Sequence, residues 1–144
     1  MTAFVLDASV AAKWFLPAAD ESLAAEALQI LREFSRARIR LLVPDLFWAE
    51  FGNVLWKAAR AERISRKAAE ESIQTIEQAG LQTVSSATLL RNAFAIAATT
   101  DRTVYDAMYV ALAIDSAAPF VTADERLANA LAARFPVRWL GALY

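Results

Sequence analysis

The sequence predicts an α/β protein, a single domain with a parallel five-stranded sheet flanked by helices. Five short apolar runs alternate with longer stretches in which apolar residues recur at helical spacing. Several of these runs are apolar along most of their length, which is typical of strands covered on both faces. The chain of 144 residues contains no repeat and no Pro/Gly-rich linker, so we expect one domain over 1–144.

Each predicted strand is a short run rich in Val, Leu, Ile or Phe. The first, AFVL, stops at Asp7, although a carboxylate is an unusual end for a buried run. Such a residue is either a helix cap or one arm of a functional site. The strands are expected at 3–6, 39–43, 81–84, 119–122 and 137–140.

The segments between the strands carry helix start and stop signals. The stretch after Pro44-Asp45 places Phe47, Phe51 and Leu55 at helical spacing, and another helix is expected to stop at Gly80. The helices are expected from Asp20 to about Ser35, from Asp45 to about 61, from Ser65 to Gly80, and after Ser86, Thr103 and Asp124.

The composition excludes several kinds of chemistry. Without histidine or cysteine, the chain has no Ser-His-Asp triad, no thiol nucleophile and no zinc site made of nitrogen or sulfur ligands. The net charge of −1 provides no general basic field, so any contact with nucleic acid must be local. Carboxylates are therefore the leading candidates for catalysis.

Four acidic residues stand where a parallel sheet would gather them. Ligands of such sheets bind at the carboxyl ends of the strands. Asp7 ends the first strand, Glu50 lies early in the helix after the second, Asp106 lies in the first turn of its helix, and Asp124 follows PFVT. We expect all four on one edge of the sheet.

Each acid also has a structural alternative. Asp7 and Asp124 could be helix N-caps, and Asp106 stands three residues after Thr103 in a capping-box-like pattern. Glu50 is needed by no cap, although a polar helix face could hold it. Clustered carboxylates repel one another unless a cation compensates. Oxygen ligands of this kind favour Mg²⁺ or Mn²⁺, which assist phosphodiester cleavage.

The four acids stand in segments that resemble the PIN-domain ribonucleases, most closely the VapC-type toxins. VLDASV is similar to the family's opening strand, and PDLFWAEFGNVLWK to the helix with the second acid. VYDAMYVALA is similar to the segment with the third acid, and FVTADERLA to the segment with the fourth.

The resemblance implies a sheet ordered 3-2-1-4-5 and an endoribonuclease that depends on Mg²⁺ or Mn²⁺. It implies the toxin of a VapBC-type toxin–antitoxin pair, with RNA as substrate. Asp7, Glu50, Asp106 and Asp124 would be the catalytic and metal-binding residues. Candidate supporting polar residues are Ser9, Thr122 and Asn53, and candidate phosphate contacts are Lys13 and Arg102.

The chain is rich in large apolar residues, at 58% apolar overall. We expect that one small monomer does not cover all of those in the N-terminal part and near 45–61, and that a homodimer and a cognate antitoxin use the surplus. No apolar run is long enough for a membrane span, and no basic leader is present, so a cytoplasmic location is expected. The apolar residues in question are Trp14, Trp48, Phe51, Leu55 and Trp56.

Other functions remain open at this stage. A haloacid-dehalogenase-type phosphatase also ends its first strand in Asp, but it needs a second Asp where this chain has Ser9. A receiver-like signalling domain needs an acid after the third strand, where LQTVSS has none. A PIN-like scaffold that only binds is the third alternative.

Overall fold

The computed structural model describes residues 1–144 and contains one parallel sheet with the strand order β3-β2-β1-β4-β5. This confirms the predicted fold class and strand order. The apolar runs are strands because β-branched and large apolar residues pack well on a pleated surface buried on both faces. The strands are β1 (Thr2–Leu6), β2 (Ile39–Pro44), β3 (Gln82–Val84), β4 (Phe120–Thr122) and β5 (Val137–Trp139).

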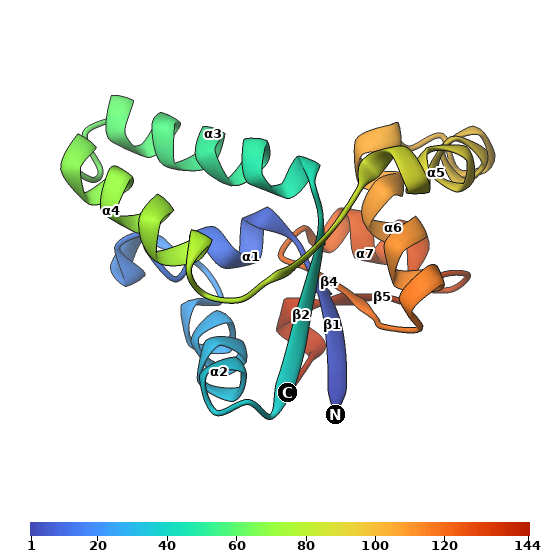
Figure 1. Ribbon diagram of the computed structural model, residues 1–144, viewed down its shortest axis with the longest axis horizontal. Helices are drawn as coiled ribbons and strands as arrows, with labels where there is room; N and C mark the ends of the chain where they lie inside the picture. The colour runs from blue at the N-terminus through green and yellow to red at the C-terminus, as the bar shows by residue number, and fades with distance from the viewer.

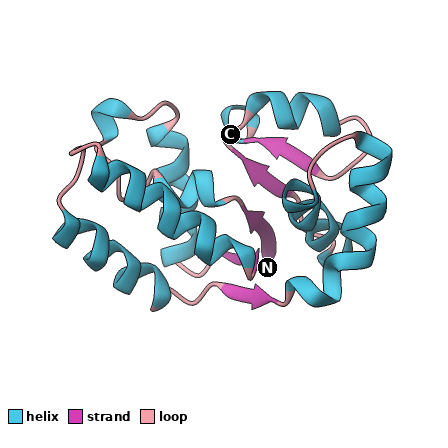
Figure 2. Cartoon of the chain, turned by 90° about the horizontal axis from the view of Figure 1, so that it is seen from above, coloured by secondary structure: helices cyan, strands magenta, loops and turns pink.

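The helices lie on both sides of the sheet, as Figures 1 and 2 show. Helices α1 to α4 lie on one side, and α5 and α6 pack together on the other. None of the helices has the length and apolar character needed to cross a membrane. The helices are α1 (Ala8–Ala12), α2 (Ala24–Ser35), α3 (Leu46–Arg60), α4 (Arg66–Glu77), α5 (Ser86–Thr100), α6 (Val104–Ser116) and α7 (Glu125–Leu131), with single 3₁₀ turns at Ala18–Asp20 and Leu140–Ala142.

One predicted helix start was wrong by a few residues, and a second was wrong by a single residue. The helix expected after Asp20 begins at Ala24, because a 3₁₀ turn comes first and Leu23 has a left-handed backbone with φ of 57°. The N-cap of α5 is Ser85 rather than Ser86, since the Ser85 hydroxyl accepts from the Ala87 N–H. The Ser86 hydroxyl instead donates to Asp45.

The register of the central strands places the ends of β1 and β4 side by side. Val5 pairs with Phe120, and Leu6 pairs with Val121. The Asp7 N–H then donates to the Val121 carbonyl at 3.1 Å. The residues that follow these two strands therefore meet at the topological switch point, between the half of the sheet formed by β1, β2 and β3 and the half formed by β4 and β5.

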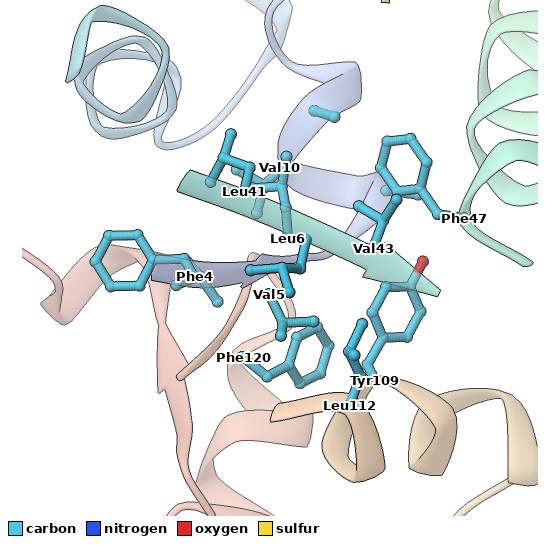
Figure 3. Packing of buried hydrophobic residues seen from close by; sticks show 14 of the residues in the cluster. Phe4, Val5, Leu6, Val10, Leu41, Val43, Phe47, Tyr109, Leu112 and Phe120 are labelled. Carbon is cyan, nitrogen blue, oxygen red and sulfur yellow. The ribbon is translucent and has the colours of Figure 1, made fainter. Parts of the chain in front are cut away.

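The core is formed on both faces of β1 and β2 (Figure 3). Val5 and Leu6 are completely buried, and the ring of Tyr109 stacks on Phe120 with 4.9 Å between centroids. Because these side chains pack tightly around β1, they fix the position of the strand end from which Asp7 extends.

The expected surplus of apolar surface near 45–61 is mostly absent. Phe51 and Leu55 are buried in the core. Trp14 and Trp48 pack against the core, and their indole N–H groups donate to the Ala27 carbonyl and to the Thr83 hydroxyl. The prediction was wrong for these residues because α3 packs against both α1 and α4, so that apolar side chains can be covered on two sides.

Four of the eight exposed large apolar side chains lie instead on α5 and α6. Phe94 is 65% exposed and Leu90 is 50% exposed, and Tyr105 and Ile114 also face solvent. On α3, Trp56 alone among the five predicted residues is exposed. A large part of the exposed apolar surface therefore lies on the opposite side of the sheet from the one expected.

Candidate active site

The four acidic residues come from four separate segments that end or begin at the carboxyl edge of the sheet. Asp7 follows β1, and Asp124 follows β4 as the N-cap of α7. Glu50 lies in the second turn of α3, after β2, and Asp106 lies in the first turn of α6. We call Asp7, Glu50, Asp106 and Asp124 the carboxylate edge.

Asp7 is held by uncharged donors. Its Oδ1 accepts from the Ser9 N–H at 3.3 Å, which makes it the N-cap of α1. Its Oδ2 accepts from the Thr122 hydroxyl at 2.7 Å. The cap that the sequence suggested is therefore present, and the second oxygen has a separate partner from β4.

Thr122 connects the two central strands at this point. Its side chain is completely buried, and its hydroxyl also accepts from the Asp124 N–H at 3.0 Å. The Ser9 hydroxyl accepts from the Ala123 N–H at 3.4 Å. Ser9 and Thr122 thus fix the chain around Asp7 and Asp124.

Glu50 has a partner that the sequence analysis did not identify. The Tyr109 hydroxyl donates to Glu50 Oε1 at 2.6 Å, although the two residues lie 59 positions apart. The sequence indicates only that Tyr109 lies on the same helix face as Asp106, because it stands three residues later. That signal alone does not identify Glu50 as the acceptor.

Asp106 and Asp124 are positioned by helix starts. The Thr103 hydroxyl accepts from the Asp106 N–H at 3.1 Å, so that Thr103 is the N-cap of α6. Asp124 Oδ1 accepts from the Leu127 N–H at 3.1 Å. The N-cap role is therefore realised by the Asp124 side chain, whose Oδ2 is left without a hydrogen bond, whereas Asp106 takes part in the cap of α6 only through its backbone N–H.

Three of the acids have pKa values above their ordinary range. Burial is the main cause of the raised pKa of Asp7, Glu50 and Asp106. Repulsion adds to it, because the Asp106 charge raises the pKa of Asp7 and of Glu50, and the Asp124 charge raises that of Asp106. Asp7, Glu50 and Asp106 are therefore buried and close enough to other acids to resist ionisation.

The carboxylate edge receives little compensation from basic side chains. None of the five ion pairs in the structure includes one of its members. Arg102 is near enough to lower the pKa of Asp106, which opposes the effect of burial. Its guanidinium also donates to the Arg126 carbonyl at 3.4 Å.

Two other predicted site residues are placed differently. Lys13 forms an ion pair with Glu21, with 3.3 Å between Nζ and Oε1, and its side chain is mostly buried. Asn53 is exposed on α3, one turn after Glu50, and makes no side-chain hydrogen bond. The structure therefore gives Lys13 a partner other than phosphate and gives Asn53 no fixed contact.

The acidic side chains could hold a hard cation, but they do not form a closed cage. No three of them converge to direct coordination of one ion. All of the donor atoms are oxygens. Their negative charges repel one another, and no ion pair with a basic side chain balances them. This combination suits Mg²⁺ or Mn²⁺, because such an ion binds through few carboxylates and keeps several waters.

The fold and the position of these acids define a class of protein, and the family comparison agrees. The chain belongs to the PIN-domain family, whose model matches residues 4–131. Among named relatives, it is similar to Ribonuclease VapC3 of Pyrobaculum aerophilum. The two are 33% identical over 127 residues, which cover 87% of this chain and 92% of the relative.

Solved structures share the same fold. The crystal structure of PAE2754 from Pyrobaculum aerophilum has a TM-score of 0.70 and 23% identity, and the match covers 99% of this chain and 86% of that one. A toxin–antitoxin complex from Klebsiella pneumoniae has a TM-score of 0.58 and 14% identity, with 94% and 95% covered. VapBC2 from Rickettsia felis, bound to a promoter DNA fragment, has a TM-score of 0.60 and 11% identity, with 96% and 98% covered.

Proposed function

We propose that this protein is a metal-dependent endoribonuclease and the toxin of a VapBC-type toxin–antitoxin pair. The observation that carries the proposal is the carboxylate edge, where four acids from separate segments meet without an ion pair. The similarity to Ribonuclease VapC3 supports RNA as the substrate class. Asp7, Glu50, Asp106 and Asp124 would hold Mg²⁺ or Mn²⁺, directly or through water.

The protein's own residues perform the positioning. When bound, the ion supplies Lewis-acid polarisation of a phosphoryl oxygen and a more acidic water. Thr122 at the end of β4 and the Ser9 N–H at the start of α1 hold the two oxygens of Asp7 in place. The bond from Tyr109 occupies Oε1 of Glu50, which leaves Oε2 free to orient a water or receive its proton.

The phosphatase alternative is weaker than the nuclease. Ser9, which stands in place of the second Asp, is used to accept the Ala123 N–H, so it supplies no acid to that chemistry. A second alternative is a scaffold that only binds and has no catalytic use for the four acids. A scaffold would gain stability from replacing repelling carboxylates, so their retention favours catalysis.

An antitoxin and a second copy of this chain are the proposed protein partners. Residues of α3, α4 and β3 line a groove of about 350 Å³, which includes the apolar Trp48, Phe51 and Ile73 as well as Glu77. This groove suits an apolar anchor of the antitoxin, whose basic side chain would reach the carboxylate edge. The exposed Leu90 and Phe94 on α5 suit a homodimer contact, and light scattering on the purified protein tests it.

Anomalous diffraction tests the metal site directly. Crystals soaked in Mn²⁺ are expected to show a peak among Asp7, Asp106 and Asp124, and the purified protein is expected to cleave RNA only with Mg²⁺ or Mn²⁺ present. Cleavage at full rate in excess chelator, with no peak at saturating Mn²⁺, would falsify the proposed function.

A further inference from the structure

Tyr109 combines a buried ring with a hydroxyl that reaches the site. The residue is only 2% exposed, and its ring stacks on Phe120 at an interplanar angle of 15°. In Figure 3 the ring rises from α6 beside the end of β2, and its oxygen points toward the side of α3. That oxygen donates to Glu50 Oε1 at 2.6 Å.

The hydrogen bond joins the two sides of the sheet. Glu50 belongs to α3, whereas Tyr109 belongs to α6 on the opposite side (Figure 1). The Tyr109 ring stacks on Phe120 of β4, and Phe120 pairs with Val5 of β1, the strand that ends just before Asp7. One side chain therefore contacts both the second acid and the strand next to the first.

We propose that Tyr109 is a positioning residue, whose hydroxyl fixes the carboxylate of Glu50 relative to Asp7 for metal and water binding. The inference rests on the proposed function, since it concerns the same acidic site. Tyr109 does not touch the substrate in this role. It acts through Glu50, in the way that hydrogen-bond donors behind a metal ligand orient that ligand.

Packing alone does not explain the hydroxyl. A phenylalanine would fill the same space and stack on Phe120 equally well, without a polar atom to satisfy in a buried place. Glu50 has a long side chain with three rotatable bonds, so it needs a fixed partner to keep one orientation. Tyr109 is the only residue that forms a side-chain hydrogen bond with it.

The test compares Tyr109→Phe with Tyr105→Phe as the matched control. Tyr105 lies one turn earlier on α6, is 69% exposed, and its hydroxyl makes no hydrogen bond with any of the four acids. Mn²⁺ affinity is measured by calorimetry, and kcat and KM are measured on RNA. Tyr109→Phe is expected to weaken Mn²⁺ binding by about 10- to 100-fold and to lower kcat more than it raises KM. Tyr105→Phe is expected to match wild type.

A double-mutant cycle with Glu50→Gln separates positioning from a general structural role. If Tyr109 acts through Glu50, then Tyr109→Phe has little further effect on Mn²⁺ affinity once Glu50 is changed. The melting temperatures of all variants show that each is folded. If Tyr109→Phe lowers Mn²⁺ affinity equally with Glu50 and with Gln at position 50, or lowers it in neither case, the inference is overturned and the proposed function is not. Absence of Mn²⁺ binding by the wild-type protein overturns the proposed function and the inference together.

Discussion

The two ends of α1 carry opposite arrangements of charge. At its N-terminal end, Asp7 belongs to the carboxylate edge, where uncharged hydroxyl and amide groups hold the acids. At its C-terminal end, Lys13 is 3.3 Å from Glu21, and the Arg63 guanidinium is 2.8 Å from the other oxygen of Glu21. We call Lys13, Asp20, Glu21 and Arg63 the Glu21 cluster.

The contrast shows that partly buried acids elsewhere in this chain are neutralised by ion pairs with basic side chains. In the Glu21 cluster each charge has a partner of opposite sign, so the desolvated groups stabilise one another. The carboxylate edge lacks such partners, and burial and repulsion raise the pKa values of three of its members. Such an arrangement lowers stability and leaves room for a cation from outside the chain.

The largest expected effect is the loss of activity in Asp106→Asn. Asn is nearly isosteric, and the Thr103 cap uses only the backbone N–H of position 106, so the fold is expected to be kept. Loss of the ligand charge is expected to lower the RNA cleavage rate by about 10²- to 10⁴-fold. Single-turnover cleavage assays on the folded variant measure this loss. Wild-type cleavage by the variant would reduce Asp106 to a structural residue of the helix start.

The second-largest expected effect is a change in the melting temperature of Asp106→Asn, which depends on pH and on bound metal. For an acid whose folded-state pKa is raised, the folded state binds the proton more tightly than the unfolded state does. Ionising such an acid therefore lowers the stability of the folded state. This loss of stability is fully present above the folded pKa and disappears as the pH falls toward the ordinary values, 3.8 for Asp and 4.5 for Glu. Without divalent metal, Asp106→Asn is therefore expected to melt above wild type at neutral pH, and the difference is expected to shrink as the pH is lowered.

Mn²⁺ is expected to remove the same loss of stability at neutral pH. Binding at 100 times the dissociation constant stabilises the folded state by about 2.7 kcal/mol, and this increase should be largely lost in Asp106→Asn. Melting curves of both proteins with and without Mn²⁺ measure it. Asp45 has a lowered pKa and loses its contribution in acidic solution, but both proteins contain Asp45, so this loss cancels in the difference between them. A shift of equal size in both proteins would place the metal elsewhere.

Much of the fold and of the site follows from local features of the sequence. The apolar runs predict the strands, and the acid after each of two central strands predicts Asp7 and Asp124 at one edge. The bond between Tyr109 and Glu50 could not be predicted, because it depends on how α3 and α6 approach each other over the sheet edge. The burial of Phe51 and Leu55 likewise depends on packing that periodicity does not describe.

The smallest effect concerns the other end of α1. Glu21→Gln leaves the mostly buried Lys13 without its ion-pair partner, so we expect the free energy of unfolding to fall by about 2 kcal/mol. Arg66→Ala is the control, because the exposed Arg66–Glu70 pair on α4 contributes less than about 0.5 kcal/mol. Urea unfolding measures both changes. The cleavage rate of folded Glu21→Gln protein is expected to stay within about twofold of wild type, since surface and ion-pair changes away from the reacting groups leave the transition state unchanged. A loss of cleavage close to that of Asp106→Asn would show that the Glu21 cluster positions α1, and Asp7 with it, rather than only stabilising the fold.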